Sequence, residues 1–141
     1  MKKTGLIIAT LLTFSQAEFT RAESGIVTDS QTQLQWQDLY ADNNVPRNYG
    51  DDAIDYCSSL DLDGTGWRLP NINELKSLLV DTQFAPSINE VFQSTVNDWY
   101  WSSSTRKIDS DYRWVVNFNS GAVSIRPRIN NNYTSYIRCV R

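Results

Sequence analysis

The two cysteines of this chain, Cys57 and Cys139, stand 82 positions apart. Their use depends on the start of the chain, which reads Met-Lys-Lys, continues with a mostly apolar run over residues 5–14, and then places small residues at positions 17 and 22. These are the three parts of a secretory signal peptide. An exported protein folds in an oxidising compartment, where an even number of cysteines indicates a disulfide. The sequence therefore predicts a Cys57–Cys139 bond that closes most of the folded chain.

Export also sets the size and the location of the mature protein. We expect residues 1–22 to be the signal peptide, with cleavage after residue 17 or 22, and a single domain over residues 23–141. The apolar run is too short to span a bilayer and no later run is long enough, so we expect no transmembrane segment. The expected product is a bacterial protein of the periplasm, the cell surface or the medium.

Charge is unevenly distributed along the chain. Residues 23–105 carry 3 basic and 13 acidic side chains, whereas residues 106–141 carry 7 basic and 2 acidic ones. Such asymmetry can mark a surface for a polyanion, although the two parts could also neutralise each other across the fold. Either cleavage leaves a net charge of −5.

The chain contains no histidine, which removes several kinds of chemistry. Serine and cysteine nucleophiles activated by imidazole are excluded, as are metal sites that need histidine. With both cysteines in a disulfide, thiolate chemistry is excluded too. Paired carboxylates remain for glycan hydrolysis, but they are scattered, so we expect no enzyme, no metal and no other cofactor.

Periodicity predicts helices early and strands late. Short strands are expected over residues 25–28 and 34–36, a loop over 42–50, and a helix through Ala53, Tyr56, Cys57 and Leu60. Alternation then predicts an extended segment at 99–101, strands over 112–118 and 122–125, and a last strand over 136–141. This order indicates an α+β fold with two main helices packed on an antiparallel sheet.

The second main helix has a clear start. Asn71 is a typical N-cap residue, Glu74 stands three positions later as in a capping box, and leucines at 75, 78 and 79 provide a buried face. Pro86 is expected to open a short third helix that runs to Phe92.

The acidic turn at residues 61–64 needs a separate reading, because its spacing is that of part of a calcium loop. An EF-hand loop in this register would place Ser59 and Pro70 at its ends, where acidic ligands are usual. We therefore expect a helix-ending turn, with Trp67 in the core and Arg68 paired with Asp61 or Asp63.

Six short motifs follow one another along the chain: Gln35-Trp-Gln37, Ala53-Ile-Asp-Tyr-Cys57, Gly66-Trp-Arg-Leu-Pro-Asn71, Tyr100-Trp-Ser-Ser103, Trp114-Val-Val-Asn-Phe118 and Arg138-Cys-Val-Arg141. In this order they resemble the Lcl C-terminal domain family, the globular end of a bacterial collagen-like adhesin. The resemblance covers residues 25–141 and implies a C-type-lectin-like fold, in which a disulfide also joins the first helix to the last strand.

The function that the resemblance implies is adhesion through a glycan, including sulfated polysaccharides. This chain lacks the Gly-X-Y stalk of the namesake adhesin, so stalk-driven trimers and their avidity are not expected. The triplets with which calcium-dependent lectins hold sugar are also missing, so recognition is expected to be independent of calcium.

The candidate ligand-binding residues combine aromatic rings with basic side chains. Aromatic faces stack on sugar rings, and guanidinium groups pair with sulfate or carboxylate oxygens. The candidates are Tyr100, Arg106, Lys107, Arg126, Arg128 and Tyr133. We expect a glycan or sulfated polysaccharide as partner and no nucleic acid. The alternatives are a structural envelope module that contacts a protein partner, and a carboxylate-based glycan hydrolase.

Overall fold

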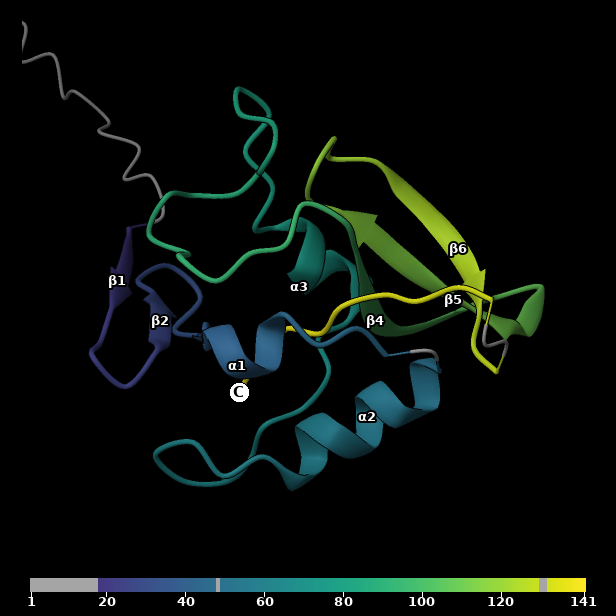
Figure 1. The fold of residues 1–141 in the computed structure, drawn as a ribbon, viewed down its shortest axis with the longest axis horizontal. Helices are drawn as coiled ribbons and strands as arrows, with labels where there is room; N and C mark the ends of the chain where they lie inside the picture. Colours follow the sequence, from purple (N-terminus) through teal and green to yellow (C-terminus); the bar gives the residue numbers. More distant parts are fainter. Residues whose placement is uncertain (1–17, 48, 130–131) are drawn as a thin grey trace, which may run out of the picture.

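The structure is a computed structural model that describes residues 18–47, 49–129 and 132–141. Its elements occur in the order β1 (Phe19–Arg21), β2 (Ile26–Asp29), β3 (Gln35–Gln37), α1 (Tyr40–Asn43), α2 (Gly50–Ser59), α3 (Ile72–Lys76), β4 (Trp99–Arg106), β5 (Asp109–Asn117) and β6 (Val123–Pro127). The α+β class is confirmed. In place of one sheet there are two, each with three antiparallel strands, in the orders β1-β2-β3 and β4-β5-β6 (Figure 1).

The first sheet contains one strand that the sequence did not predict. β2 and β3 fall on the expected segments, and β1 pairs with β2 from Phe19 opposite Asp29 to Arg21 opposite Val27. The Phe19 ring also meets Phe92 edge to face, with 5.5 Å between their centroids. β1 therefore includes residues that cleavage after residue 22 would remove.

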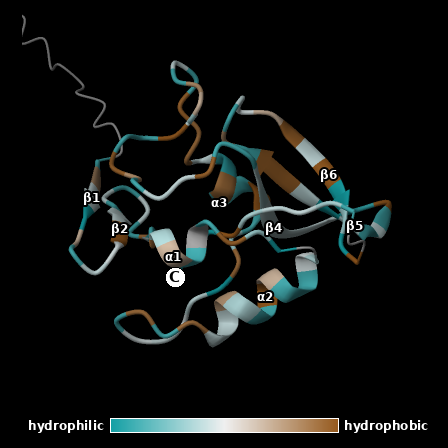
Figure 2. Cartoon of the chain, in the orientation of Figure 1, coloured by the Kyte–Doolittle hydropathy of each residue, from teal (hydrophilic) through white to brown (hydrophobic). Residues whose placement is uncertain are grey.

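The second sheet separates two hydrophobic clusters on its two faces. Alternation along β4 and β5 places Tyr100 and Val116 in one cluster with Leu75 and Leu78, whereas Trp101 and its cross-strand partner Val115 belong to the other. The second cluster includes Ala53 and Cys57 of α2, together with Trp67. The prediction that Trp67 lies in the core is confirmed, since this residue is only 2 % exposed. In Figure 2 the apolar colour gathers in α3 and in the middle of this sheet.

The disulfide between Cys57 and Cys139 is confirmed, and it joins α2 to the end of the chain. The C-terminal segment runs between the two sheets without forming a full strand of its own. Val140 makes single bridges to Trp36 and Arg68, and Tyr136 makes one to Tyr100 at the open edge of β4. The segment is therefore held on several sides, which explains why a short sequence run could be predicted as extended but not as a strand of one sheet.

The predicted helices have different outcomes. α2 is confirmed, and Asn71 caps α3 as predicted, because its side chain accepts from the Glu74 backbone N–H at 2.9 Å and donates to the Glu74 carboxylate. α3 ends at Lys76, so Leu78 and Leu79 lie beyond it. The third helix after Pro86 is wrong, since Ile88 bridges back to Leu79 in an extended loop. α1 occupies part of the segment predicted as loop.

In the part of the chain that the structure describes, no helix is long and apolar enough to cross a membrane.

Candidate functional site

Basic side chains gather at one end of the second sheet. In an antiparallel sheet the end of one strand lies beside the start of the next, and here β4 ends at Arg106, β5 begins at Asp109 and β6 ends at Pro127 (Figure 1, right). We call this region the basic sheet end. Its basic residues are Arg106, Lys107, Arg113, Arg126 and Arg128.

Two of these arginines are neutralised by aspartates. Asp51, in the first turn of α2, accepts from Arg113 at 2.7 Å and from Arg128 at 3.1 Å. Arg128 also lies 3.8 Å from Asp111. Arg113 is almost fully buried and donates a further bond to the Ser103 carbonyl, so its role is to tie α2 to the sheet. Of the predicted candidates, Arg128 is thus partly used by the fold itself.

Arg126 has a different environment, because it lies between two aromatic rings. Its guanidinium carbon is 5.1 Å from the centroid of Trp99 and 5.7 Å from that of Tyr133, distances at which a cation is attracted to an aromatic face. Its Nη1 donates to the Thr134 carbonyl and, at 3.1 Å, to the Ser135 hydroxyl. Among the described residues, Nε and Nη2 of this guanidinium have no hydrogen-bond partner. The three N–H groups on these two nitrogens therefore remain for a ligand.

Burial affects the charge of Arg126. Desolvation lowers the pKa of the Arg126 guanidinium, and the negative charge of Asp98 and the nearby Tyr133 act in the opposite direction. A guanidinium stays protonated in proteins despite such shifts. The partial loss of water leaves Arg126 as a weakly hydrated cation at the surface, which is favourable for pairing with an anion.

Arg106 and Lys107 lie at the turn between β4 and β5. No hydrogen bond or ion pair involves either side chain within the described residues. The next residue, Ile108, is 79 % exposed, and Ile129 at the same end of the sheet is 61 % exposed. The turn thus presents two unpaired cations and an apolar side chain to solvent.

Tyr100 does not belong to this site, and its prediction as a ligand contact is wrong. The side chain is fully buried, meets Phe118 edge to face and accepts from the Val96 backbone N–H at 2.8 Å. Burial raises the pKa of Tyr100, as expected for a phenol away from water. The reason lies in the alternation along β4, because successive side chains of a strand point to opposite faces of the sheet and Trp99 and Tyr100 therefore face opposite ways. The ring beside Arg126 is Trp99, which the sequence analysis did not select.

The remaining predicted ligand contacts are one tyrosine and four basic residues. Tyr133 is 46 % exposed beside Arg126, and Arg106, Lys107, Arg126 and Arg128 share one end of the sheet. Four candidates thus come from one end of the sheet, and Tyr133 contacts one of them, Arg126, whose side chain also reaches Trp99 at the start of β4. The signal that could have found Trp99 is the strict alternation of the 99–101 segment together with the charge of Asp98, which draws Arg126 toward the same strand.

The acidic turn after α2 is held by the fold. The Gly64 N–H donates to the Asp61 carboxylate at 3.2 Å, and the Trp67 indole donates to the Leu62 and Gly64 carbonyls. The expected pairing of Arg68 with Asp61 or Asp63 is wrong, because Arg68 pairs with Glu74 at 2.7 Å. Across the described ranges, no group of three or more acidic, cysteine or histidine side chains is placed to hold a metal ion.

Comparison with known proteins identifies the family. The family model of the Lcl C-terminal domain matches residues 25–141, which is nearly the whole chain. The chain belongs to the Lcl C-terminal domain family. No curated protein matches the chain. As an Lcl C-terminal domain, the protein is an adhesion-related domain, and in this Lcl domain Arg126 combines a cationic group with the rings of Trp99 and Tyr133.

Proposed function

We propose that this protein is an exported adhesion module that binds an anionic glycan, such as a sulfated polysaccharide, through the basic sheet end. The observation that carries the proposal is the position of Arg126 between Trp99 and Tyr133, with the N–H groups of Nε and Nη2 unengaged among the described residues. A flat ring can contact a sugar face while a guanidinium edge pairs with a sulfate or carboxylate oxygen. One polysaccharide unit could use both groups at once.

Local charge supports an anionic partner although the mature chain has a net charge of −5. Asp51 and Asp111 offset Arg113 and Arg128, while Arg106, Lys107 and Arg126 form no ion pair among the described residues. The acidic residues nearest to these three are Asp109, opposite Arg106, and Asp98, whose charge acts on Arg126. At physiological ionic strength the Debye length is about 8 Å, so a polyanion at this surface responds to the nearest charges. Binding is independent of calcium, since only side-chain cations and rings take part.

We further infer a C-type-lectin-like fold. The α+β class, the two helices α2 and α3 and a disulfide that joins α2 to the end of the chain are the features of that plan. A lectin-like scaffold also suits a binding role, because its loops and strand ends are positioned by a cross-linked core.

The proposal is tested by retention on immobilised dextran sulfate at low salt. The double variant Arg106→Ser with Lys107→Ser removes the two unpaired cations, and we expect its affinity to fall by about tenfold, which corresponds to roughly 1.4 kcal/mol. The matched control is Lys76→Ser, which removes an exposed cation from α3. Equal losses in both variants would show that retention reflects net charge rather than this surface.

The ring contribution is tested separately with Tyr133→Ala, and Tyr40→Ala is the control because Tyr40 is an exposed tyrosine of α1, 76 % accessible. We expect only the first change to weaken retention. A protein partner is the second candidate, favoured by the exposed Ile108 and Ile129. Loss of partner binding in Ile108→Ala, with dextran sulfate never retained, would select that candidate.

The hydrolase alternative finds less support from the carboxylates. General acid catalysis needs a carboxyl that stays protonated near neutral pH. The deeply buried Asp38 has its pKa lowered, since Arg138 and Arg21 outweigh the effect of desolvation, and both of its oxygens are already hydrogen-bonded. The most buried acid of the described chain is therefore unsuited to that role.

A further inference from the structure

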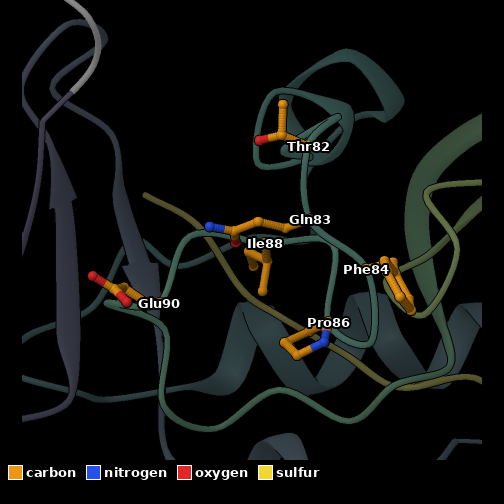
Figure 3. Close-up of a pocket in the computed structure, with 6 residues that line it drawn as sticks. All are labelled: Thr82, Gln83, Phe84, Pro86, Ile88 and Glu90. Atoms are coloured by element: carbon orange, nitrogen blue, oxygen red, sulfur yellow. The ribbon is translucent and has the colours of Figure 1, made fainter.

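We propose that a hollow in the loop after α3 is a second binding site, which takes an uncharged sugar ring. The hollow has a volume of about 410 Å³, within the range of small-molecule sites. It is lined by Thr82, Gln83, Phe84, Pro86, Ile88 and Glu90. Figure 3 shows Gln83 and Ile88 side by side at the centre, with Phe84 and Glu90 on opposite sides.

The walls of the hollow are fixed before any ligand arrives. The loop is closed at its base by the Val80 N–H, which donates to the Ser87 carbonyl at 3.1 Å, and is tightened by the Gln83 N–H, which donates to the Val80 carbonyl at 3.0 Å. Two further bonds anchor it to the turn after β5, from the Ala85 N–H to Asn119 and from the Ser87 N–H to Phe118. Ile88 forms part of the buried core at 1 % exposure. A ligand would therefore meet a surface that needs little ordering.

The polar groups around the hollow are available. Within the described residues, the Thr82 hydroxyl, the Gln83 amide and the Glu90 carboxylate have no hydrogen-bond partner. Together they offer donors and acceptors of the kind that fix sugar hydroxyl groups. They surround an apolar floor, and this combination of a few polar groups with apolar surface is typical of ligand sites.

Phe84 provides the second, independent observation. Its ring is 82 % exposed, the highest value among the large apolar side chains of the described chain. The ring gains nothing from the core, yet the loop that carries it is held by the hydrogen bonds described above. An exposed aromatic face beside unpartnered hydroxyl, amide and carboxylate groups fits a pyranose ring, whose C–H face can lie on the aromatic ring while its hydroxyls reach the polar groups.

Charge determines which sugars fit. Glu90 lines the hollow, Asp81 precedes it in the chain, and no basic residue is part of the lining. A sulfated or carboxylated ring would be repelled by these charges, whereas the hydroxyls of a neutral ring would donate hydrogen bonds to the Glu90 carboxylate and exchange them with the Gln83 amide. The hollow thus differs in ligand class from the basic sheet end.

The two sites use different residues: Ile88 belongs to one hydrophobic cluster of the second sheet, whereas Trp99, which pairs with Asn117 at the end of β5, packs against the other cluster. This inference therefore does not depend on the proposed function, and the two sites can fail or succeed independently.

The test is an NMR titration of the ¹⁵N-labelled mature protein with methyl α-mannoside, methyl β-glucoside and methyl N-acetyl-β-glucosaminide. We expect at least one of them to shift the amide signals of residues 82–90, with a dissociation constant on the order of 1–10 mM. Phe84→Ala should weaken this binding at least tenfold. The control Tyr40→Ala removes a similarly exposed aromatic side chain from α1 and should leave it unchanged.

The outcomes separate the alternatives. Shifts confined to residues 82–90 and lost in Phe84→Ala support the site, as does the same binding retained in Glu90→Gln, which keeps the hydrogen-bonding groups but removes the charge. No localised shift with any of the three sugars, or shifts that Phe84→Ala leaves unchanged, would overturn it. Dextran sulfate should leave the amides of the hollow unshifted; shifts of residues 82–90 by this polyanion would also overturn the inference.

Discussion

Arg138 donates to the carboxylate of Asp38 at 2.9 Å, and both side chains are fully buried. Arg138 also donates to the carbonyls of Gln37 and Ser94, and the other Asp38 oxygen accepts from Arg21 at 2.9 Å. The Gln93 and Ser94 N–H groups complete the set around the carboxylate. The pair therefore connects β1, the segment after β3, the loop before β4 and the end of the chain.

Replacing Asp38 by Asn should strongly destabilise the protein. The change leaves the buried Arg138 without its counter-charge, and removing one partner of a buried pair costs about 3–5 kcal/mol. The control is Asp52→Asn, which makes the same chemical change at an exposed aspartate. Urea unfolding of the two variants measures the difference in their free energies of unfolding. Equal stability of the two variants would contradict the role assigned to the pair.

The same carboxylate predicts how stability depends on pH. The arginines around Asp38 hold its pKa below the ordinary value of 3.8 against the opposing effect of desolvation. A carboxyl with a lowered folded-state pKa stabilises the protein above its unfolded-state pKa, and that contribution is lost as the pH falls through 3.8 toward the lower value. The free energy of unfolding, measured from about pH 6 to pH 2.5, should therefore decrease as the pH is lowered through this range.

The variant Asp38→Asn is also the control for the decrease in stability at low pH. In Asp38→Asn this titrating group is absent, so the decline below about pH 5 should be shallower than in the unmodified protein. A parallel decline in both proteins would assign the acid sensitivity to other carboxylates.

The disulfide should contribute much of the stability. It closes a loop of 82 residues between Cys57 and Cys139, for which chain entropy predicts roughly 4–5 kcal/mol. The double variant Cys57→Ala with Cys139→Ala should unfold at markedly lower urea concentration than the oxidised protein. Peptide mapping without reductant that finds both thiols free in the exported protein would contradict the bond itself.

Loss of the N-terminal strand β1 should lower the stability of the protein. A protein that starts at Glu23 lacks β1, the contact of Phe19 with Phe92 and the ion pair of Arg21 with Asp38, so it should be less stable than one that starts at Glu18. The aromatic contact alone is worth about 0.5–1.5 kcal/mol. Thermal unfolding of the two proteins measures the loss, and Phe19→Ala in the longer protein separates the ring from the strand. Equal melting temperatures would show that β1 is dispensable.

Elements with a local signal were predictable from the sequence. The spacing of Ala53, Cys57 and Leu60 and the capping pair Asn71 and Glu74 are properties of one segment each, and both helices are present. The alternation through Val116 and Phe118 likewise predicted a strand, although Val115 on the opposite face is buried as well. The cysteine pair was predictable from the even number of cysteines and the expected signal peptide.

What could not be predicted depends on contacts distant in sequence. β1 is three residues long and exists because β2 offers it an edge, so its own residues carry little signal. The loop after Pro86 extends because it pairs with Leu79 and with the turn after β5, which overrides the local helix signal. At the site, the contact of Arg126 with Trp99 rather than Tyr100 depends on the tertiary structure. The ion pair of Arg128 with Asp51 likewise joins two elements that are distant in sequence.

The salt dependence of binding to sulfated polysaccharide tests the central claim most directly. The mature protein is titrated with dextran sulfate at several salt concentrations from about 50 to 300 mM, with and without a calcium chelator. The account predicts binding at low salt that weakens steadily as screening shortens the Debye length from about 14 to 6 Å, with no effect of the chelator. No measurable binding at about 50 mM salt, or binding that the chelator abolishes, would contradict it.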